Sequence, residues 1–377
     1  MKVVQTAFRQ GATPDFSALA AIEPNLVLAF GSVDALRQSA AALADAFPGA
    51  QRAGCSTAGE ITAKGVEDGT LVVTALHFDH TRMAQVSTVL AGMDDSFAAG
   101  KRLASGLPVA GLRAILIFGQ GVQINGSAVL SGMTEIVGAK VPITGGLAGD
   151  GGAFAQTWVL DEGGVSSDRL TCVGLYGDAL QFAHGSFGGW SPFGPARKVT
   201  RSVNNVLFEL DGESALEVYK RYLGEHASGL PASGLLFPFA MLGSDHTEVG
   251  LIRTILGVDE TSGSLTLAGD IDPNGYLRLM HASTDALVDG AEAAAEAAKA
   301  MQANSGDGLA LLVSCVGRKL VMGGRVDEEV EAVGDVFGQG ATLAGFYSYG
   351  EISPFTAGVE CKLHNQTMTI TYIAETA

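Results

Sequence analysis

A short motif, a glycine followed by an acidic residue, recurs along this 377-residue chain with similar flanking segments. Its four copies are Gly59-Glu60, Gly149-Asp150, Gly269-Asp270 and Gly350-Glu351. An apolar run of strand type lies upstream of three copies, at residues 26–32, 114–120 and 310–316, with room for a helix and a return strand in between. Two further apolar runs, split by a turn, follow the same three copies. No helical pattern precedes the Gly269 copy.

This repeat predicts an α/β fold of two related halves built from strand-helix-strand-hairpin units. We place the domain boundary near residue 200, in a segment rich in Gly, Pro and aromatic residues, which gives domains of residues 1–200 and 201–377. Open α/β sheets bind ligands beyond the carboxyl ends of their strands, where the Gly-acid loops are expected. The loops are therefore candidate ligand sites, although turn glycines and solvated acids of a duplicated scaffold explain the same pattern.

The spacing of apolar residues predicts the main helices and one further strand. Helices are expected at residues 34–47, 94–105, 127–137, 216–223, 285–303 and 327–337. Ser127 is the predicted N-cap of the third of these helices, because its hydroxyl can accept from a first-turn amide. Alternating apolar residues predict a strand over residues 203–210.

Composition excludes several classes of function. The formal charge of −17 argues against nucleic acid and anionic membrane surfaces as partners. The longest apolar stretch, residues 234–243, is far shorter than the roughly 20 residues of a membrane-spanning helix. Residues 1–16 lack the apolar core of a secretion signal, so we expect a cytoplasmic protein. The scattered cysteines are expected to be buried free thiols; they are Cys55, Cys172, Cys315 and Cys361.

Motifs of known enzyme chemistry are mostly absent. The sequence has no complete dinucleotide or P-loop fingerprint and no Gly-x-Ser-x-Gly nucleophile elbow. Cys55 lies in the first Gly-acid loop and is a possible nucleophile, but the corresponding position of the last copy is Phe346, which favours a packed thiol. His184 precedes the aromatic segment 185–195 and suits either an axial haem ligand or a core histidine. His281 is a second candidate for the haem ligand.

Four segments resemble the FIST family, named for F-box and intracellular signal transduction. These segments are residues 54–61 (GCSTAGEI), 188–224, 251–280 and 345–354 (GFYSYGEISP). The resemblance covers nearly the whole chain and includes the N-terminal and C-terminal FIST parts. It implies a bacterial sensory protein of the stand-alone type, without a fused output domain, that binds a small ligand and regulates a partner such as a histidine kinase. It also implies two ligand classes, haem with nitric oxide or amino acids.

The matching motifs supply the candidate ligand-binding residues, which are Cys55, Ser56, Glu60, Gly149, Asp150, Arg253, Tyr347, Ser348 and Glu351. Arg253 is a natural partner for a ligand carboxylate, since its guanidinium can donate two parallel hydrogen bonds, and a salt bridge to a repeat acid is equally open. We expect a sensor without enzymatic activity that binds haem through His184, or alternatively an amino acid or another small polar metabolite. A Cys55-dependent enzyme and a scaffold for protein partners are the remaining alternatives.

Overall fold

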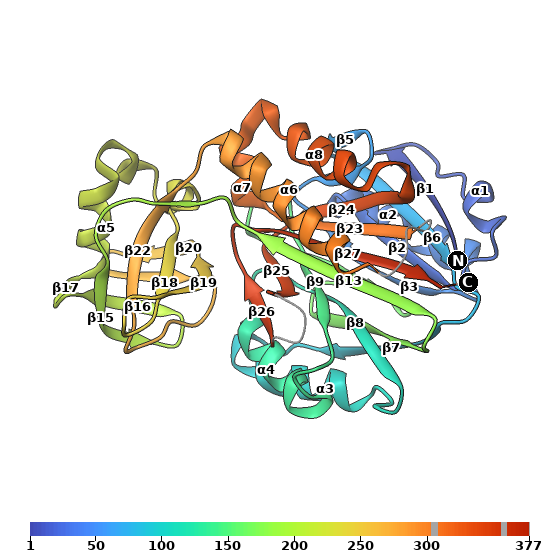
Figure 1. The fold of residues 1–377 in the computed structure, drawn as a ribbon, viewed down its shortest axis with the longest axis horizontal. Helices are drawn as coiled ribbons and strands as arrows, with labels where there is room; N and C mark the ends of the chain where they lie inside the picture. Colours follow the sequence, from blue (N-terminus) through green and yellow to red (C-terminus); the bar gives the residue numbers. More distant parts are fainter. Residues whose placement is uncertain (303–307, 356–359, 377) are drawn as a thin grey trace.

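The computed structural model describes residues 1–302, 308–355 and 360–376, which form a larger body and a smaller inserted domain (Figure 1). The larger body contains three six-stranded sheets, and the inserted domain, residues 189–283, contains the fourth. The two ends of the described chain meet in the larger body, where the α-ammonium group of Met1 lies 2.8 Å from Asp79 and 3.5 Å from Glu375.

The three sheets of the larger body have the same strand order. The first sheet consists of β1 (Lys2–Arg9), β6 (Thr70–His77), β2 (Leu26–Gly31), β3 (Gln51–Ser56), β10 (Val159–Asp161) and β11 (Gly164–Ser166). The second consists of β7 (Arg82–Val89), β12 (Arg169–Tyr176), β8 (Leu112–Gly119), β9 (Ile143–Leu147), β25 (Gly350–Pro354) and β26 (Cys361–His364). The third consists of β13 (Leu180–Phe187), β27 (Met368–Glu375), β23 (Gly308–Cys315), β24 (Ala341–Ser348), β4 (Glu60–Thr62) and β5 (Gly65–Glu67).

Each sheet is completed by a hairpin from a different unit of the chain. We number the units in chain order: unit one is residues 1–80, unit two 81–178, and unit three 179–188 with 284–376. The hairpin β4–β5 of unit one pairs with β24 of unit three, β10–β11 of unit two pairs with β3 of unit one, and β25–β26 of unit three pairs with β9 of unit two. The exchange is cyclic, so the larger body has approximate three-fold symmetry.

Helices cover the outer face of each sheet (Figure 1). The first sheet carries α1 (Ser17–Ala20) and α2 (Val33–Ala46), and the second carries α3 (Ser96–Ser105) and α4 (Gly126–Val137). The third sheet carries α6 (Thr284–Ala300), α7 (Val316–Met322) and α8 (Asp327–Phe337). The alanine-rich α6 approaches β13 closely, because a Cβ atom on Gly185 would lie 2.0 Å from the carbonyl oxygen of Ala294.

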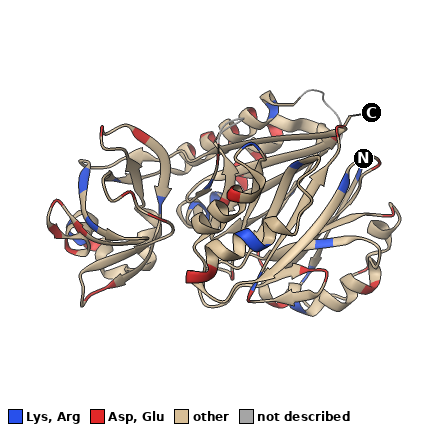
Figure 2. Ribbon diagram, turned by 90° about the horizontal axis from the view of Figure 1, so that it is seen from below, with Lys and Arg blue, Asp and Glu red and all other residues tan. Residues whose placement is uncertain are grey.

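The inner faces of the three sheets share one apolar core. The rings of Phe30 and Phe346 stack with centroids 4.6 Å apart, and Phe118 meets Phe30 edge-on at 5.5 Å. These three phenylalanines come from units one, three and two, so each unit contributes one ring to the centre. Figure 2 shows the complementary pattern, with charged residues on helices and loops and the central strands largely free of them.

The inserted domain is a nine-stranded sheet with one α-helix, α5 (Ala215–Leu223), followed by two 3-10 helices, η2 (Gly224–Gly229) and η3 (Ala232–Leu236). Its strands are β14 (Ser191–Pro192), β15 (Arg197–Val203), β16 (Val206–Leu210), β17 (Glu213–Ser214), β18 (Phe239–Leu242), β19 (Glu248–Arg253), β20 (Ile255–Asp259), β21 (Ser264–Leu267) and β22 (Tyr276–His281). The domain encloses a core of its own around Tyr219 and Phe239.

The α/β class and the repeated strand-helix-strand-hairpin unit are confirmed, and the number of units is a correction. The structure has three units and an insertion in place of two halves. The predicted boundary near residue 200 lies within β15, and the third sheet combines strands from both sides of it. The difference arises because strands far apart in the sequence pair with one another, and this exchange of hairpins has no local sequence signal.

Several local predictions are also corrected. Asn125 caps α4 in place of Ser127, since its side-chain oxygen accepts from the amide of Ala128 at 3.1 Å. The strand expected over residues 203–210 is a turn between β15 and β16 followed by β16. Helix α7 was not predicted, and residue 303 of the predicted 285–303 helix lies outside the described residues.

The three-fold arrangement requires a glycine at one equivalent position of β3, β9 and β24. A Cβ atom on Gly54, Gly145 or Gly345 would lie 1.9 to 2.0 Å from a carbonyl oxygen of the neighbouring parallel strand. We expect Gly54→Ala to lower the free energy of unfolding by at least about 2 kcal/mol, because the backbone must separate from Ala29. Urea unfolding measures this loss. Gly49→Ala, with nothing within 4 Å of its Cβ, is the control, and equal stability of both variants would contradict the packing argument.

Candidate functional site

The loops at the carboxyl ends of β3, β9 and β24 meet at one end of the larger body. The amide of Ala58 donates to the carbonyl of Tyr347 at 2.8 Å, that of Gly149 to Ser56 at 2.8 Å, and that of Tyr349 to Leu147 at 3.1 Å. These bonds repeat the cyclic order of the hairpins. They form a closed ring of backbone contacts that fixes three distant segments of the chain against one another.

A pocket of about 580 Å3 lies beside this ring, and we call it the loop pocket. Its wall comes from all three units. The lining residues are Gln10, Ser32, Val33, Asp34, Thr57, Ala58, Gly59, Glu60, Asp68, Gly69, Asp150, Gly151, Gly152, Val316, Lys319, Leu320 and Gly323. Its position agrees with the expectation that ligand space lies beyond the carboxyl ends of the strands.

Lys319 of α7 is the cationic side chain of the loop pocket. Its Nζ donates to the carbonyl oxygen of Ala58 at 2.9 Å, forms an ion pair with Asp68, and lies 5.6 Å from the ring centre of Tyr347. The sequence pattern does not indicate Lys319 as a site residue, because it belongs to no Gly-acid motif and α7 has no clear periodic signal. A lysine four residues after the strand 308–315 was the available clue.

The acidic residues of the loop pocket differ in exposure and in the number of hydrogen bonds and ion pairs that they already form. Asp34, in the first turn of α2, is exposed and receives one long hydrogen bond from Gln10 at 3.4 Å. Asp68 is exposed and paired with Lys319. Asp150 is already saturated, since it accepts from the amides of Phe154, Ala155 and Gln156 and from the hydroxyl of Tyr349. Burial acts to raise the pKa of Asp150, and these donors outweigh it and lower the pKa. Asp34 and Asp68 are therefore the acids available to a ligand.

Glu60 and Glu351 hold the exchanged hairpins in place. Glu60 accepts from the side chain of Thr57 and from the amide and hydroxyl of Thr70 at 2.9 and 2.8 Å. Glu351 repeats this pattern, accepting from Ser348 at 2.7 Å and from the amide and hydroxyl of Thr367 at 3.2 and 3.0 Å. Burial raises the pKa of both carboxyls, that of Glu351 to about 8. Glu60 lines the loop pocket with its polar atoms already engaged, and Glu351 lies outside it.

The Gly149-Asp150 copy of the motif is not the structural equivalent of the other two. In the exchanged hairpins, Glu60 lies opposite Phe346 and Glu351 lies opposite Gly146. The residue of unit two at this position is Val159, opposite Cys55. The longer loop of unit two displaces the acid from the hairpin and places Asp150 at the rim of the loop pocket. The Gly269-Asp270 copy lies in the inserted domain and belongs to no unit.

Other predicted site residues have structural partners. Cys55 is fully buried in the central core, and burial raises its pKa well above the ordinary thiol value. The hydroxyl of Ser56 donates to the carbonyl of Gly149 at 2.6 Å and accepts from the amide of Trp158 at 2.8 Å. Tyr347 is buried, and its hydroxyl donates to Glu329. The structure therefore brings the loops together as expected, but most of these side chains are buried and already have partners within the protein.

Arg253 lies in the inserted domain, away from the loop pocket. Its guanidinium donates to the backbone carbonyls of Asp270 at 3.1 Å, Ile252 at 3.1 Å and Leu363 at 3.2 Å. Burial lowers its pKa to about 10. The hydrogen bond to Leu363 links the inserted domain to β26, so Arg253 has a structural role between the inserted domain and the larger body.

His184 occupies a position that is structural in the other two units. Gln5 of β1 and Gln85 of β7 are its equivalents, and they donate to the carbonyls of Leu343 at 3.0 Å and Arg52 at 2.8 Å in a neighbouring sheet. His184 is buried, its Nδ1 has no hydrogen-bond partner among the described residues, and burial lowers its pKa to about 4. His281 is exposed at the surface of the inserted domain, with its ring 6.0 Å from that of Phe193.

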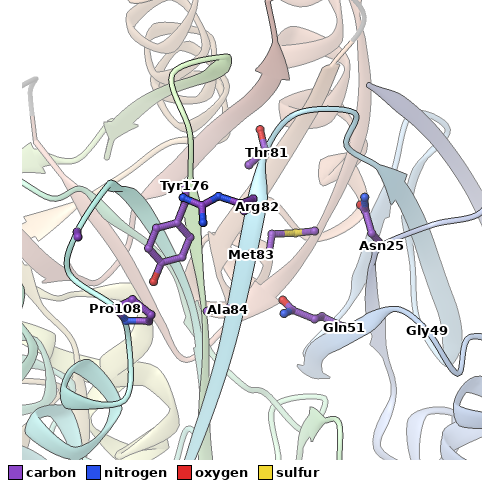
Figure 3. A pocket seen from close by; sticks show the side chains of 10 residues that line it. Asn25, Gly49, Gln51, Thr81, Arg82, Met83, Ala84, Pro108 and Tyr176 are labelled. Atoms are coloured by element: carbon purple, nitrogen blue, oxygen red, sulfur yellow. The ribbon is translucent and has the colours of Figure 1, made fainter.

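A second pocket, of about 520 Å3, lies at the opposite ends of the strands (Figure 3). Arg82 and Tyr176 lie on one side of β7, and Met83, Gln51 and Asn25 lie on the other. Alternate side chains of a strand point to opposite faces, so the edge strand divides this space. The loop pocket is therefore the better candidate for enclosing a ligand.

The fold and the loop pocket define a class of protein: a repeated-unit α/β body that offers ligand space at its converging loops and carries one inserted domain. The FIST N domain matches residues 25–213 and the FIST C domain matches residues 215–354. The chain belongs to the FIST family, which is linked to signal transduction.

Other similarities are distant. An uncharacterized protein of Methanocaldococcus jannaschii, MJ1623, is 34% identical over 87 residues, which are 23% of this chain and 17% of that protein. Among solved structures, cyanuric acid hydrolase from A. caulinodans aligns over 99% of this chain and 98% of its own at 10% identity, with a TM-score of 0.34. A second cyanuric acid hydrolase structure aligns over 99% of both chains at 10% identity, with a TM-score of 0.35.

Among the described residues, no group of three His, Cys, Asp or Glu side chains is placed to hold a metal ion. No helix in the described part of the chain has the length and apolar character needed to cross a membrane.

The buried Glu351 predicts a specific pH dependence of stability. Its pKa rises from 4.5 to about 8 on folding, so the folded chain binds a proton that the unfolded chain releases between these values. The contribution of Glu351 is fully present below about pH 4.5 and is lost as the pH rises through about 8, with a slope of up to about 1.4 kcal/mol per pH unit. Glu351→Gln should remove this slope in urea unfolding measured from pH 5 to 8. Glu292→Gln, an exposed change on α6, should keep it, and an unchanged slope in Glu351→Gln would contradict the assignment.

Proposed function

We propose that this FIST protein is a sensor that binds a small polar metabolite with an ammonium group, such as an amino acid, in the loop pocket, and that it regulates a signalling partner such as a histidine kinase. The observation that carries the proposal is the placement of Lys319, Asp34 and Asp68 around a pocket of about 580 Å3 at the three converging loops. A pocket of this size suits a small molecule.

The charges of the loop pocket match a zwitterion. Asp34 and Asp68 can accept from an ammonium group, while Lys319 and the first-turn amides of α2 can receive a carboxylate. Asp68 is largely exposed, so its ion pair with Lys319 contributes little to stability. A zwitterionic ligand can therefore replace the Asp68–Lys319 ion pair with two ion pairs of its own, one to each side chain, at a small cost in free energy. Gly151 and Gly152 line the same pocket and are exposed, so their backbone groups are accessible beside these charged side chains.

A metabolite screen by thermal denaturation tests this proposal. We expect one or more amino acids, or related amines, to raise Tm by at least about 2 °C at 100 times Kd, because the ligand binds the folded chain alone. Lys319→Met and Asp34→Asn should abolish the rise. Lys101→Met, an exposed change on α3, should preserve it. A broad screen with no rise for the unmodified protein would contradict the proposal.

Haem remains a second prediction, and the arrangement around His184 does not fit it. An axial ligand needs an imidazole that opens onto a space for the macrocycle. His184 is enclosed between sheets, lines neither pocket described above, and replaces a glutamine of the other units. Nitric oxide sensing through a His184-bound haem therefore has no supporting contact among the described residues. The expected absence of enzymatic activity also stays a prediction, and the burial of Cys55 disfavours a thiol nucleophile.

Absorption spectra decide the haem prediction. With one equivalent of haemin we expect a broad spectrum like that of free haemin, the same for the unmodified protein and for His184→Ala. His281→Ala serves as the matched histidine control. A sharp Soret band that responds to nitric oxide and disappears only in His184→Ala would reverse our preference and establish the haem sensor.

A further inference from the structure

The inserted domain joins the larger body through two chain segments that touch each other. We call them the neck: residues 188–190, which follow β13, and residues 283–287, which begin α6. A Cβ atom on Gly189 would lie 2.0 Å from the carbonyl oxygen of Ala286, so the two backbones are in direct contact. Figure 1 shows two chain segments that connect the smaller domain with the larger body, one leading from β13 and the other into α6.

Arg318 of α7 binds both segments of the neck. Its guanidinium donates to the carbonyl of Gly188 at 2.5 Å and to the carbonyl of Leu287 at 2.7 Å. The same group forms an ion pair with Glu329 of α8 at 2.8 Å, and both side chains are fully buried. Removing one partner of a buried pair leaves an uncompensated charge, so this geometry is strongly favoured over a loosened one.

The next residue of the same helix is Lys319 of the loop pocket. Helix α7 therefore reaches the neck through Arg318 and the pocket through Lys319, which contacts Ala58 and Asp68 of unit one. Consecutive helical residues point about 100° apart, so one short helix can serve both places. The two sites are also joined through Tyr347, whose ring faces Lys319 and whose hydroxyl donates to Glu329.

We propose that α7 couples the loop pocket to the inserted domain: a change in the contacts of Lys319 moves α7, shifts Arg318 at the neck, and thereby changes the orientation of the inserted domain. The inference rests on the proposed function in taking the loop pocket as the place where the ligand acts. It adds the path by which a change in the loop pocket would reach another part of the protein, and it identifies the inserted domain as the part that moves.

Few hydrogen bonds outside the neck hold the inserted domain to the larger body. Those among the described residues are Asn125 to Asp270, Arg253 to Leu363, and Gln366 to Leu235 and Thr254, while Trp190 of the neck also donates to Gln366. Phe355 of unit three also packs against the core of the inserted domain, so this contact combines a few hydrogen bonds with apolar packing. Interfaces between domains within a chain move by default unless they are large and apolar.

A distance measurement between two spin labels tests the coupling in the full chain without any ligand. Val203→Cys places one label on the inserted domain and Val89→Cys places the other on unit two; these side chains are 60% and 51% exposed. The four native cysteines are buried, so they are protected from labelling. We expect Lys319→Met to shift the main distance by more than about 2 Å or to broaden it comparably. We expect the same of Arg318→Lys, which keeps the charge and loses the two-pronged donation to the neck.

Matched variants complete the test. Arg52→Lys is the control for a buried arginine bound to backbone carbonyls elsewhere, and it should leave the distance unchanged. Lys319→Arg should also keep it. The double variant Lys319→Met with Arg318→Lys should shift no further than Arg318→Lys alone, since both changes act on one route. If Arg318→Lys fails to fold, the pair Lys319→Met and Lys319→Arg decides the question alone.

An unchanged distance in Lys319→Met would overturn the coupling, and so would additive shifts in the double variant. This outcome is separate from the fate of the proposed function. A metabolite screen without a hit leaves a measured shift intact and removes only the ligand, whereas a protein that binds a metabolite and shows no shift retains the sensor and loses this route.

Discussion

The exchange of hairpins between the three units is the constraint on which the rest of the structure depends. Each sheet gains its final two strands from another unit, so a single unit would leave one edge of β3, β9 or β24 unpaired. Closing the cycle brings the loops after β3, β9 and β24 together and lets their backbones bond in a ring. Glu60 and Glu351 then hold two of the three hairpins through buried hydrogen bonds to threonines and a serine. The loop pocket therefore arises as a consequence of how the sheets are completed.

The loop pocket lies where the three units differ. The equivalent positions share glycines and apolar residues, because packing demands the same solution three times, and two of the three hairpins also share a buried acid. The loop pocket departs from the pattern through Lys319 on a helix of unit three and through the displaced Asp150 loop of unit two. A charged group that breaks a symmetric scaffold has no packing role to repeat, which makes it the natural place for recognition.

Unit three also carries the inserted domain, and the same unit supplies α7. Its two consecutive basic residues face different environments: Arg318 is buried against the neck and Glu329, while Lys319 reaches the pocket. A fully buried ion pair has little freedom to adjust, since displacing either group from its partner is costly. Rigid helices of this kind are among the elements that can carry energetic coupling between distant parts of a protein.

The sequence by itself determined the elements of this protein. Periodicity located the main helices and strands, the repeated Gly-acid motif revealed the unit and the loops at the strand ends, and the net charge argued against nucleic acid as a partner. Tertiary structure decided which residues meet. Strand pairing between units has no local sequence signal, so it alone separated Glu351, a buried hairpin acid, from Asp150, a rim acid with the same flanking glycine. Tertiary structure likewise determines that Arg253 donates to backbone carbonyls and that Lys319 is the cationic side chain of the loop pocket. The surroundings of a side chain depend on segments far away in the chain.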